Sequence, residues 1–129
     1  MKRLVALLVL AVAAAIAGPA WAQAPAQPTF ATTKVEGTNN VYIFRYLNHQ
    51  SMFVVTSDGV IATDPIGYVR RDAPSVYLAE IKKVTDKPVK YVVYSHHHYD
   101  HIAGGKPFKD AGATFVAHQR TKERLALLK

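Results

Sequence analysis

The hydrophobic pattern of this chain changes its period near Asp72, and that change restricts the fold more than any other feature of the sequence. Before Asp72, three short runs rich in β-branched and aromatic residues are typical of strands. They cover residues 41–47, 52–56 and 60–63, with a turn at 48–51. An Asp-Gly pair between the last two runs tolerates the positive φ of a tight hairpin turn. The first part of the chain is therefore predicted to be an antiparallel meander.

After Asp72, apolar residues recur at helical spacing and alternate with short apolar runs. The predicted helices cover residues 72–86, 102–110 and 119–129, and the predicted strands cover 91–94 and 113–117. These two strands lack polar alternation, which is typical of strands covered on both faces. Strand–helix–strand order implies parallel strands joined by right-handed crossovers, so we predict an α/β fold.

The N-terminus has the pattern of an export signal. Two basic residues precede an unbroken apolar run at 4–17, and residues 20–22 have the small-x-small form that signal peptidase reads. We predict that 1–22 is a signal peptide cleaved after Ala22, which places the protein in the periplasm or outside the cell. An uncleaved membrane anchor is the alternative, but a Gly-Pro pair after the apolar run argues against it.

The rest of the chain is divided by composition. Residues 23–34, rich in Pro, Ala, Gln and Thr, are expected to form a flexible lead-in, and 35–129 a partial domain. The last predicted helix reaches Lys129 without a Gly, Asn or Pro to end it, and its apolar face needs a partner. We therefore expect the chain to be the N-terminal part of a longer one. An exposed sheet edge would then allow self-association.

Composition excludes several classes of protein. The absence of cysteine rules out disulfides, a Cys-ligated zinc and a thiol nucleophile. Sixteen Lys and Arg against nine Asp and Glu give a net charge of +7, but no basic run is longer than two residues. Scattered charge of this kind is typical of a solvated surface, so we expect a small-molecule substrate and no nucleic-acid partner.

A dense cluster of metal-ligating side chains follows the predicted strand 91–94. Its sequence is His96-His97-His98-Tyr99-Asp100-His101. Imidazole and carboxylate suit zinc, and also iron or manganese. His96 and His98 can point the same way in an extended turn, while Asp100 and His101 can face a second position beyond a bend. A bound metal lowers the pKa of its water from about 15.7 to about 7, which provides a nucleophile at neutral pH.

Two other predicted strands also end on polar residues, Asp64 and His118. Because the carboxyl ends of parallel strands meet at one edge of a sheet, both are candidates to contact and orient the metal ligands without binding the metal themselves. His97 is expected to point away, and His49, in the predicted turn, receives no role. A solvated histidine-rich loop and a structural metal site are the alternatives, although structural zinc sites usually have four ligands, often Cys.

Residues 96–101 match the H-x-H-x-D-H signature of the metallo-β-lactamase superfamily, which the chain resembles over 35–129. The hairpin that leads to Asp64 resembles an earlier motif of the family, and residues 102–105 resemble its helix entry after the signature. The resemblance implies an αββα sandwich of which only the N-terminal half is present.

The resemblance also implies a ligand set. His96 and His98 would bind a first metal, and Asp100 and His101 a second, with Zn²⁺ as the expected ion. Family members add another His, a bridging carboxylate and a last His beyond the signature. In this chain His118 is the sole candidate for such a role.

These features predict an exported, zinc-dependent hydrolase in which Asp100 both ligates and orients the nucleophile. The substrate would be an ester, lactone, thioester, amide or phosphoester. An iron-dependent oxidoreductase similar to sulfur dioxygenases is one alternative, because two His and one Asp with open positions suit Fe(II) and oxygen. A non-catalytic metal-binding protein is the other.

Overall fold

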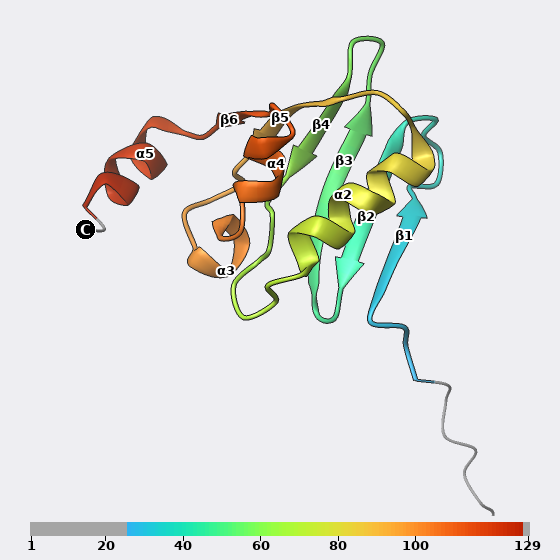
Figure 1. The fold of residues 1–129 in the computed structure, drawn as a ribbon, viewed down its shortest axis with the longest axis horizontal. Helices are drawn as coiled ribbons and strands as arrows, with labels where there is room; N and C mark the ends of the chain where they lie inside the picture. Colours follow the sequence, from blue (N-terminus) through green and yellow to red (C-terminus); the bar gives the residue numbers. More distant parts are fainter. Residues whose placement is uncertain (1–25, 128–129) are drawn as a thin grey trace, which may run out of the picture.

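The computed structural model describes residues 26–127, which form one mixed sheet with helices on one face (Figure 1). The strands are β1 Phe30–Lys34, β2 Val41–Tyr46, β3 His49–Val55, β4 Val60–Thr63, β5 Val89–Val93 and β6 Thr114–Val116. The helices are α2 Ala73–Val84, α3 Tyr99–Ile102, α4 Lys106–Asp110 and α5 Gln119–Ala126. The predicted signal peptide and its cleavage position lie outside the described residues. Within those residues, no helix is long and apolar enough to cross a membrane.

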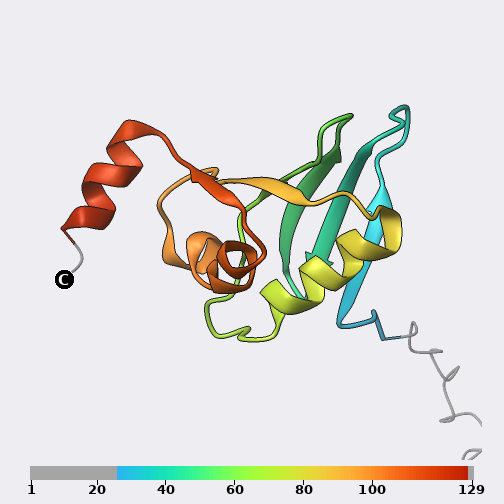
Figure 2. The same cartoon turned by 45° about the horizontal axis from the view of Figure 1, so that its top comes forward.

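The strand order is β1-β2-β3-β4-β5-β6, with antiparallel pairing from β1 to β4 and parallel pairing from β4 to β6. This confirms the predicted meander followed by parallel strands. Helix α2 connects β4 to β5, and α3 and α4 connect β5 to β6. Figure 2 shows these three helices on the same side of the sheet, whereas α5 stands apart beyond β6. The α/β class is therefore confirmed, as a sheet layer and a helix layer.

The core lies between α2 and the central strands. Phe44 of β2 and Tyr77 of α2 are fully buried and stacked, with ring centroids 4.5 Å apart. Burying a tyrosine requires a partner for its hydroxyl, and that of Tyr77 donates to the Met52 carbonyl oxygen over 2.7 Å. Burial also raises the pKa of Tyr77 well above its usual range. This core fixes the sheet from which the functional loops project.

The expected lead-in at 23–34 is shorter than predicted, because its last five residues form β1. Phe30 stacks on Tyr46 with ring centroids 6.3 Å apart, and the Thr32 hydroxyl donates to Glu80 of α2 over 2.8 Å. Two consecutive threonines also favour a strand, since β-branched side chains fit a pleated surface. The prolines and glutamines that indicated flexibility all lie before Phe30.

The predicted turn at 48–51 is also shorter than expected. The chain turns at Leu47 and Asn48, with a positive φ of 52° at Leu47, and β3 starts at His49. Residues 49–51 were misassigned because they are polar. In the structure the His49 side chain contacts Asp100, and the Ser51 hydroxyl donates to the Asp64 carbonyl oxygen over 2.5 Å.

Candidate metal centre

Three segments meet at one edge of the sheet. The loop after β4 starts at Asp64, the loop after β5 carries residues 95–101, and β3 starts at His49. Strands β4 and β5 are parallel, so their carboxyl ends share this edge. Strand β3 runs antiparallel to β4, which brings the beginning of β3 to the same edge. Topology alone thus gathers these residues from separate parts of the sequence.

Asp64 is buried at this edge of the sheet and contacts the loop after β5. Its carboxylate accepts hydrogen bonds from the Ser95 backbone N–H, over 2.9 Å, and from the Ser95 hydroxyl. The same carboxylate lies 3.3 Å from Nδ1 of His101. Asp64 is also held at a positive φ of 27°, a conformation uncommon for a residue with a side chain. The expected contacts from a candidate ligand imidazole and a loop amide to Asp64 are thus present.

The two loops are also joined through their backbones. Ile66 N–H donates to the His101 carbonyl oxygen over 2.9 Å, and Gly67 N–H donates to that of Ala103 over 2.8 Å. The buried Arg70 donates to the Ile66 carbonyl oxygen over 3.2 Å and to that of Asp100 over 3.4 Å. The position of the histidine loop is therefore set by the loop after β4.

Asp100 lies between two imidazoles. Its Oδ2 is 3.0 Å from Nε2 of His49 and 3.8 Å from Nε2 of His101. The hydrogen bond with His49 holds the pKa of Asp100 below its usual range. His49, Asp100 and His101 each offer one ligand atom, and these atoms lie within 4.8 Å of one another. Two imidazole nitrogens and a carboxylate oxygen are donors that zinc accepts, so these residues fit a divalent metal.

A second group of potential ligands comprises Asp64, His96 and His101, again with one atom each within 4.8 Å. The oxygens of Asp64 are already engaged by Ser95 and His101, which favours a supporting role for this carboxylate. The Ser95 hydroxyl donates to Asp64 and lies 2.8 Å from Nδ1 of His96, so its oxygen can accept a hydrogen bond from Nδ1–H. Nε2 of His96 is then the nitrogen available to a metal.

The other predicted residues lie at the margin of these groups. The His98 ring is 4.6 Å from that of His96 between centroids, but His98 is exposed and belongs to neither group. Nε2 of His97 is 2.8 Å from a guanidinium nitrogen of Arg124, consistent with the expectation that it points away. Exposed His118 caps α5 by accepting a hydrogen bond from Arg120 N–H over 3.2 Å, and it also belongs to neither group. The ligand roles of His96, His98, Asp100 and His101 stay predictions.

His49 is the residue that sequence reasoning missed. It lies 47 positions before His96, in a stretch that the polar composition assigned to a turn. The available signal was topological: a strand paired antiparallel with β4 must begin where β4 ends. That inference requires the start of β3 to be placed correctly.

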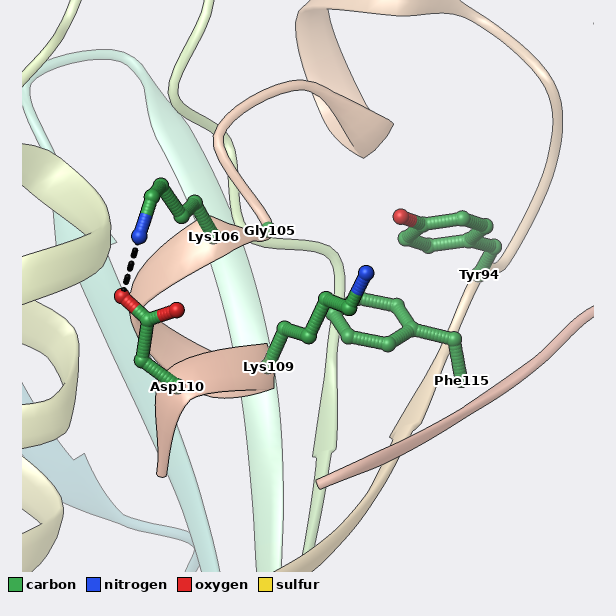
Figure 3. A pocket seen from close by; sticks show the side chains of 6 residues that line it. All are labelled: Tyr94, Gly105, Lys106, Lys109, Asp110 and Phe115. Atoms are coloured by element: carbon green, nitrogen blue, oxygen red, sulfur yellow. Dashed lines mark hydrogen bonds and ion pairs between the residues drawn. The ribbon is translucent and has the colours of Figure 1, made fainter. Parts of the chain in front are cut away.

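A pocket of about 640 Å³ lies between α4 and strands β5 and β6 (Figure 3). It is lined by Tyr94, Gly105, Lys106, Lys109, Asp110 and Phe115. The Lys106 ammonium and the Asp110 carboxylate form an ion pair of 2.6 Å across one turn of α4. None of its lining residues belongs to either group of potential metal ligands.

Comparison with known proteins identifies the family. Residues 46–126, more than half of the chain, match the model of the metallo-beta-lactamase superfamily. The chain belongs to this superfamily. The match contains both loops and the whole H-x-H-x-D-H stretch, so the resemblance predicted from residues 96–101 is confirmed.

Individual members of the superfamily resemble parts of the chain. A linear primary-alkylsulfatase from Pseudomonas sp. (strain ATCC 19151) is 58% identical over 31 residues, which are 24% of this chain and 6% of the relative. A hydroxyacylglutathione hydrolase from Pelagibacter ubique (strain HTCC1062) is 38% identical over 55 residues, or 40% of this chain and 23% of the relative. The chain thus spans less than a quarter of either curated relative.

Solved structures of the superfamily share the fold. The metallo-beta-lactamase from Pontibacter korlensis superposes with a TM-score of 0.63 at 22% identity, covering 75% of this chain and 47% of that one. The metallo-beta-lactamase IND-7 gives a TM-score of 0.58 at 27% identity with the same coverage. The arrangement of sheet and helices is therefore that of metallo-beta-lactamases over three quarters of the chain.

Proposed function

We propose that this chain belongs to an exported, metal-dependent hydrolase whose metal ligands are His96, His98, Asp100 and His101, with Asp64 supporting them at the same edge of the sheet. The observation that carries the proposal is the convergence of imidazole nitrogens on the Asp100 carboxylate at the carboxyl ends of β4 and β5. Membership of the metallo-beta-lactamase superfamily supports the same chemistry. Zn²⁺ suits the donors, and iron or manganese is the alternative.

Each residue has a separate task in this proposal. His96 and His98 would hold one metal position, and Asp100 and His101 the other. A metal bound there supplies a Lewis acid and lowers the pKa of water to about 7. Asp100 would also orient the attacking water toward the substrate.

The residues behind the ligands keep them in place. Asp64 fixes the His101 ring through Nδ1, and Ser95 connects Asp64 to the His96 ring. Such outer contacts select the ring tautomer and typically account for a 10–100-fold effect on metal affinity. We therefore assign Asp64 to support of the ligands, whereas the contact that His118 makes within residues 26–127 is the cap of α5.

The substrate proposal is an ester, thioester, lactone, amide or phosphoester. The relatives named as an alkylsulfatase and as a hydroxyacylglutathione hydrolase make alkyl sulfates and acylglutathiones the first compounds to assay. Export rests on the N-terminal pattern, which predicts cleavage after Ala22. Cell fractionation and the intact mass of the periplasmic protein test that part separately.

The hydrolase proposal is tested by turnover of this substrate panel, with β-lactams included, by the full-length native protein. We expect activity that chelation removes and added Zn²⁺ restores. His98→Ala and Asp100→Ala should each lower kcat/KM by more than about 100-fold, since both remove predicted ligands. His97→Ala, in the same loop, is the matched control and should retain activity. Unchanged turnover in His98→Ala or Asp100→Ala would contradict the mechanism.

An iron-dependent oxidoreductase is the second candidate, and one observation favours it. Each group of potential ligands contains two histidines and one carboxylate, the donor set of many non-haem Fe(II) oxygenases. Stoichiometric iron in the isolated protein, together with oxygen-dependent turnover, would replace the hydrolase proposal. Zinc with oxygen-independent turnover would exclude it.

A further inference from the structure

His49 makes the closest contact to the Asp100 carboxylate among the histidines of this edge, although it lies far outside the His96–His101 signature. Its Nε2 is 3.0 Å from Oδ2 of Asp100, and its ring centroid is 5.6 Å from that of His101. The His49 side chain is 17% exposed, less than the 27% of His101. His49 is thus at least as enclosed as a residue of the family signature.

The second ring nitrogen of His49 has a polar neighbour of its own. Nδ1 lies 3.1 Å from Oδ1 of Asn48, and an amide oxygen can only accept a hydrogen bond. With the Asn48 amide in this orientation, Nδ1–H donates to Oδ1. In the neutral ring, Nε2 then presents a lone pair to Asp100, whose carboxylate also presents lone pairs. Two acceptors 3.0 Å apart are bridged either by a second proton on the ring or by a metal ion.

His101 has the same arrangement. Its Nδ1 lies 3.3 Å from the Asp64 carboxylate and its Nε2 faces Oδ2 of Asp100. Histidines that bind metals typically donate the other ring N–H to a carbonyl or carboxylate oxygen, which fixes the ring and exposes the ligating nitrogen. His49 and His101 therefore both approach Oδ2 of Asp100 through Nε2, and each has Nδ1 beside an oxygen atom.

We propose that His49 is a protein ligand, through Nε2, of the metal position held by Asp100 and His101. The inference rests on the metal centre of the proposed function and adds a residue that the signature does not contain. Two imidazoles and one carboxylate then come from this chain alone. Three protein ligands with a remaining open position are the usual pattern of a catalytic zinc site.

The competing role for His49 is positioning, in which Nε2–H donates a hydrogen bond to Asp100 without touching a metal. Two substitutions separate the roles. His49→Gln can place an amide N–H near the position of Nε2 and preserve that hydrogen bond, but it is a poor zinc ligand. His49→Ala removes both capabilities. His97→Ala is the matched control, because His97 contacts Arg124 and belongs to neither group of potential ligands.

The experiment measures metal binding rather than turnover. Zn²⁺ is titrated into the metal-free full chain by calorimetry, and Co²⁺ binding is followed by its visible absorption. For a ligand, we expect both His49→Gln and His49→Ala to lower the affinity of this position by more than about 100-fold, beyond what outer contacts typically cost. His97→Ala should stay within about threefold of the unsubstituted chain. Unchanged affinity in His49→Gln would overturn the ligand role and assign His49 to positioning.

A measurement on the unsubstituted chain covers the case in which the variants fail to fold. Ring ¹⁵N spectra report each histidine nitrogen separately. On addition of Zn²⁺, Nε2 of His49 should shift while Nδ1 stays protonated. A His49 ring that does not respond, in a chain that binds Zn²⁺, would refute the proposal for His49 alone. Absence of any Zn²⁺ binding would instead refute the metal centre itself.

Discussion

The loops after β4 and β5 lie side by side at one edge of the sheet, yet they are built in opposite ways. The loop after β4 is mostly buried and has positive φ at three residues with side chains, Asp64 (27°), Ile66 (50°) and Val69 (52°). The loop after β5 is more exposed and contains most of the potential metal ligands. The loop after β4 thus has a strained backbone and few potential ligands. The loop after β5 has most of the potential ligands and no positive φ before Gly104.

The difference indicates that the loop after β4 positions the loop after β5, which carries most of the potential ligands. Residues in sparsely populated conformations cost about 1–3 kcal/mol each and persist where surrounding contacts fix them. Here the strained loop supplies the Asp64 carboxylate and the backbone donors of Ile66 and Gly67 to its neighbour. The histidine loop thus gains a defined position from a segment that contributes almost no ligands. Four substitutions test this view, from the largest expected effect to the smallest.

Asp64→Ala should have the largest effect. It removes the acceptor of the Ser95 backbone N–H, the Ser95 hydroxyl and His101 Nδ1. At about 1 kcal/mol for each lost partner, we expect the free energy of unfolding of the metal-free chain to fall by about 3 kcal/mol. Urea unfolding measures it. Asp58→Ala, in the exposed β3–β4 turn, is the control and should change stability by less than about 0.5 kcal/mol.

Gly67→Ala tests the contact between the loops directly. An added Cβ would lie 2.8 Å from Cα of Gly104 and 2.9 Å from the Ala103 carbonyl oxygen, so backbone must move. Overpacking of this kind costs about 2 kcal/mol, and we expect weaker Zn²⁺ binding as the loops separate.

Gly37→Ala is the control for this substitution. A Cβ at Gly37 meets nothing within 4 Å, but φ is +75°. The expected cost is therefore about 1 kcal/mol of backbone strain, with Zn²⁺ affinity unchanged. Equal Zn²⁺ affinity in Gly67→Ala and the unsubstituted chain would show that the ligands do not depend on the first loop.

Ser95→Ala removes the hydroxyl between Asp64 and His96 while keeping the backbone hydrogen bond to Asp64. We expect a loss of about 1 kcal/mol in stability and about tenfold in Zn²⁺ affinity, because the His96 ring loses its orientation. Calorimetry measures the affinity. Ser57→Ala, in an exposed turn, should change neither quantity.

His118→Ala extends the comparison to the third parallel strand, β6. His118 follows β6 but caps α5, so we expect about 0.5 kcal/mol of lost stability and no change in Zn²⁺ affinity. Thermal unfolding and Zn²⁺ titration provide the two readouts. A clear loss of affinity would instead place His118 among the supporting residues, as its position after a parallel strand first suggested.

Much of the fold was predictable because its signals are local. The bounds 60–63 of β4 were predicted to the residue, and the change of period near Asp72 gave the parallel half of the sheet. Errors occurred where composition was ambiguous. Residues 30–34 joined the sheet as β1, and polar residues 49–51 belong to β3. The helix predicted over 102–110, with an interruption or a start near Pro107, begins at Lys106 as α4, after the short α3 at Tyr99–Ile102.

The sequence by itself determined the family and the donor chemistry, because the H-x-H-x-D-H stretch is contiguous and its residue types fix which ions it suits. It also indicated Asp64, since a residue directly after a parallel strand must lie at the ligand edge. Only the tertiary structure showed that the residues after the three parallel strands differ in their contacts. Asp64 contacts His101, whereas His118 caps α5. The tertiary structure alone brought His49 to Asp100, because that contact depends on the register between antiparallel β3 and β4, a long-range pairing that no local spacing encodes.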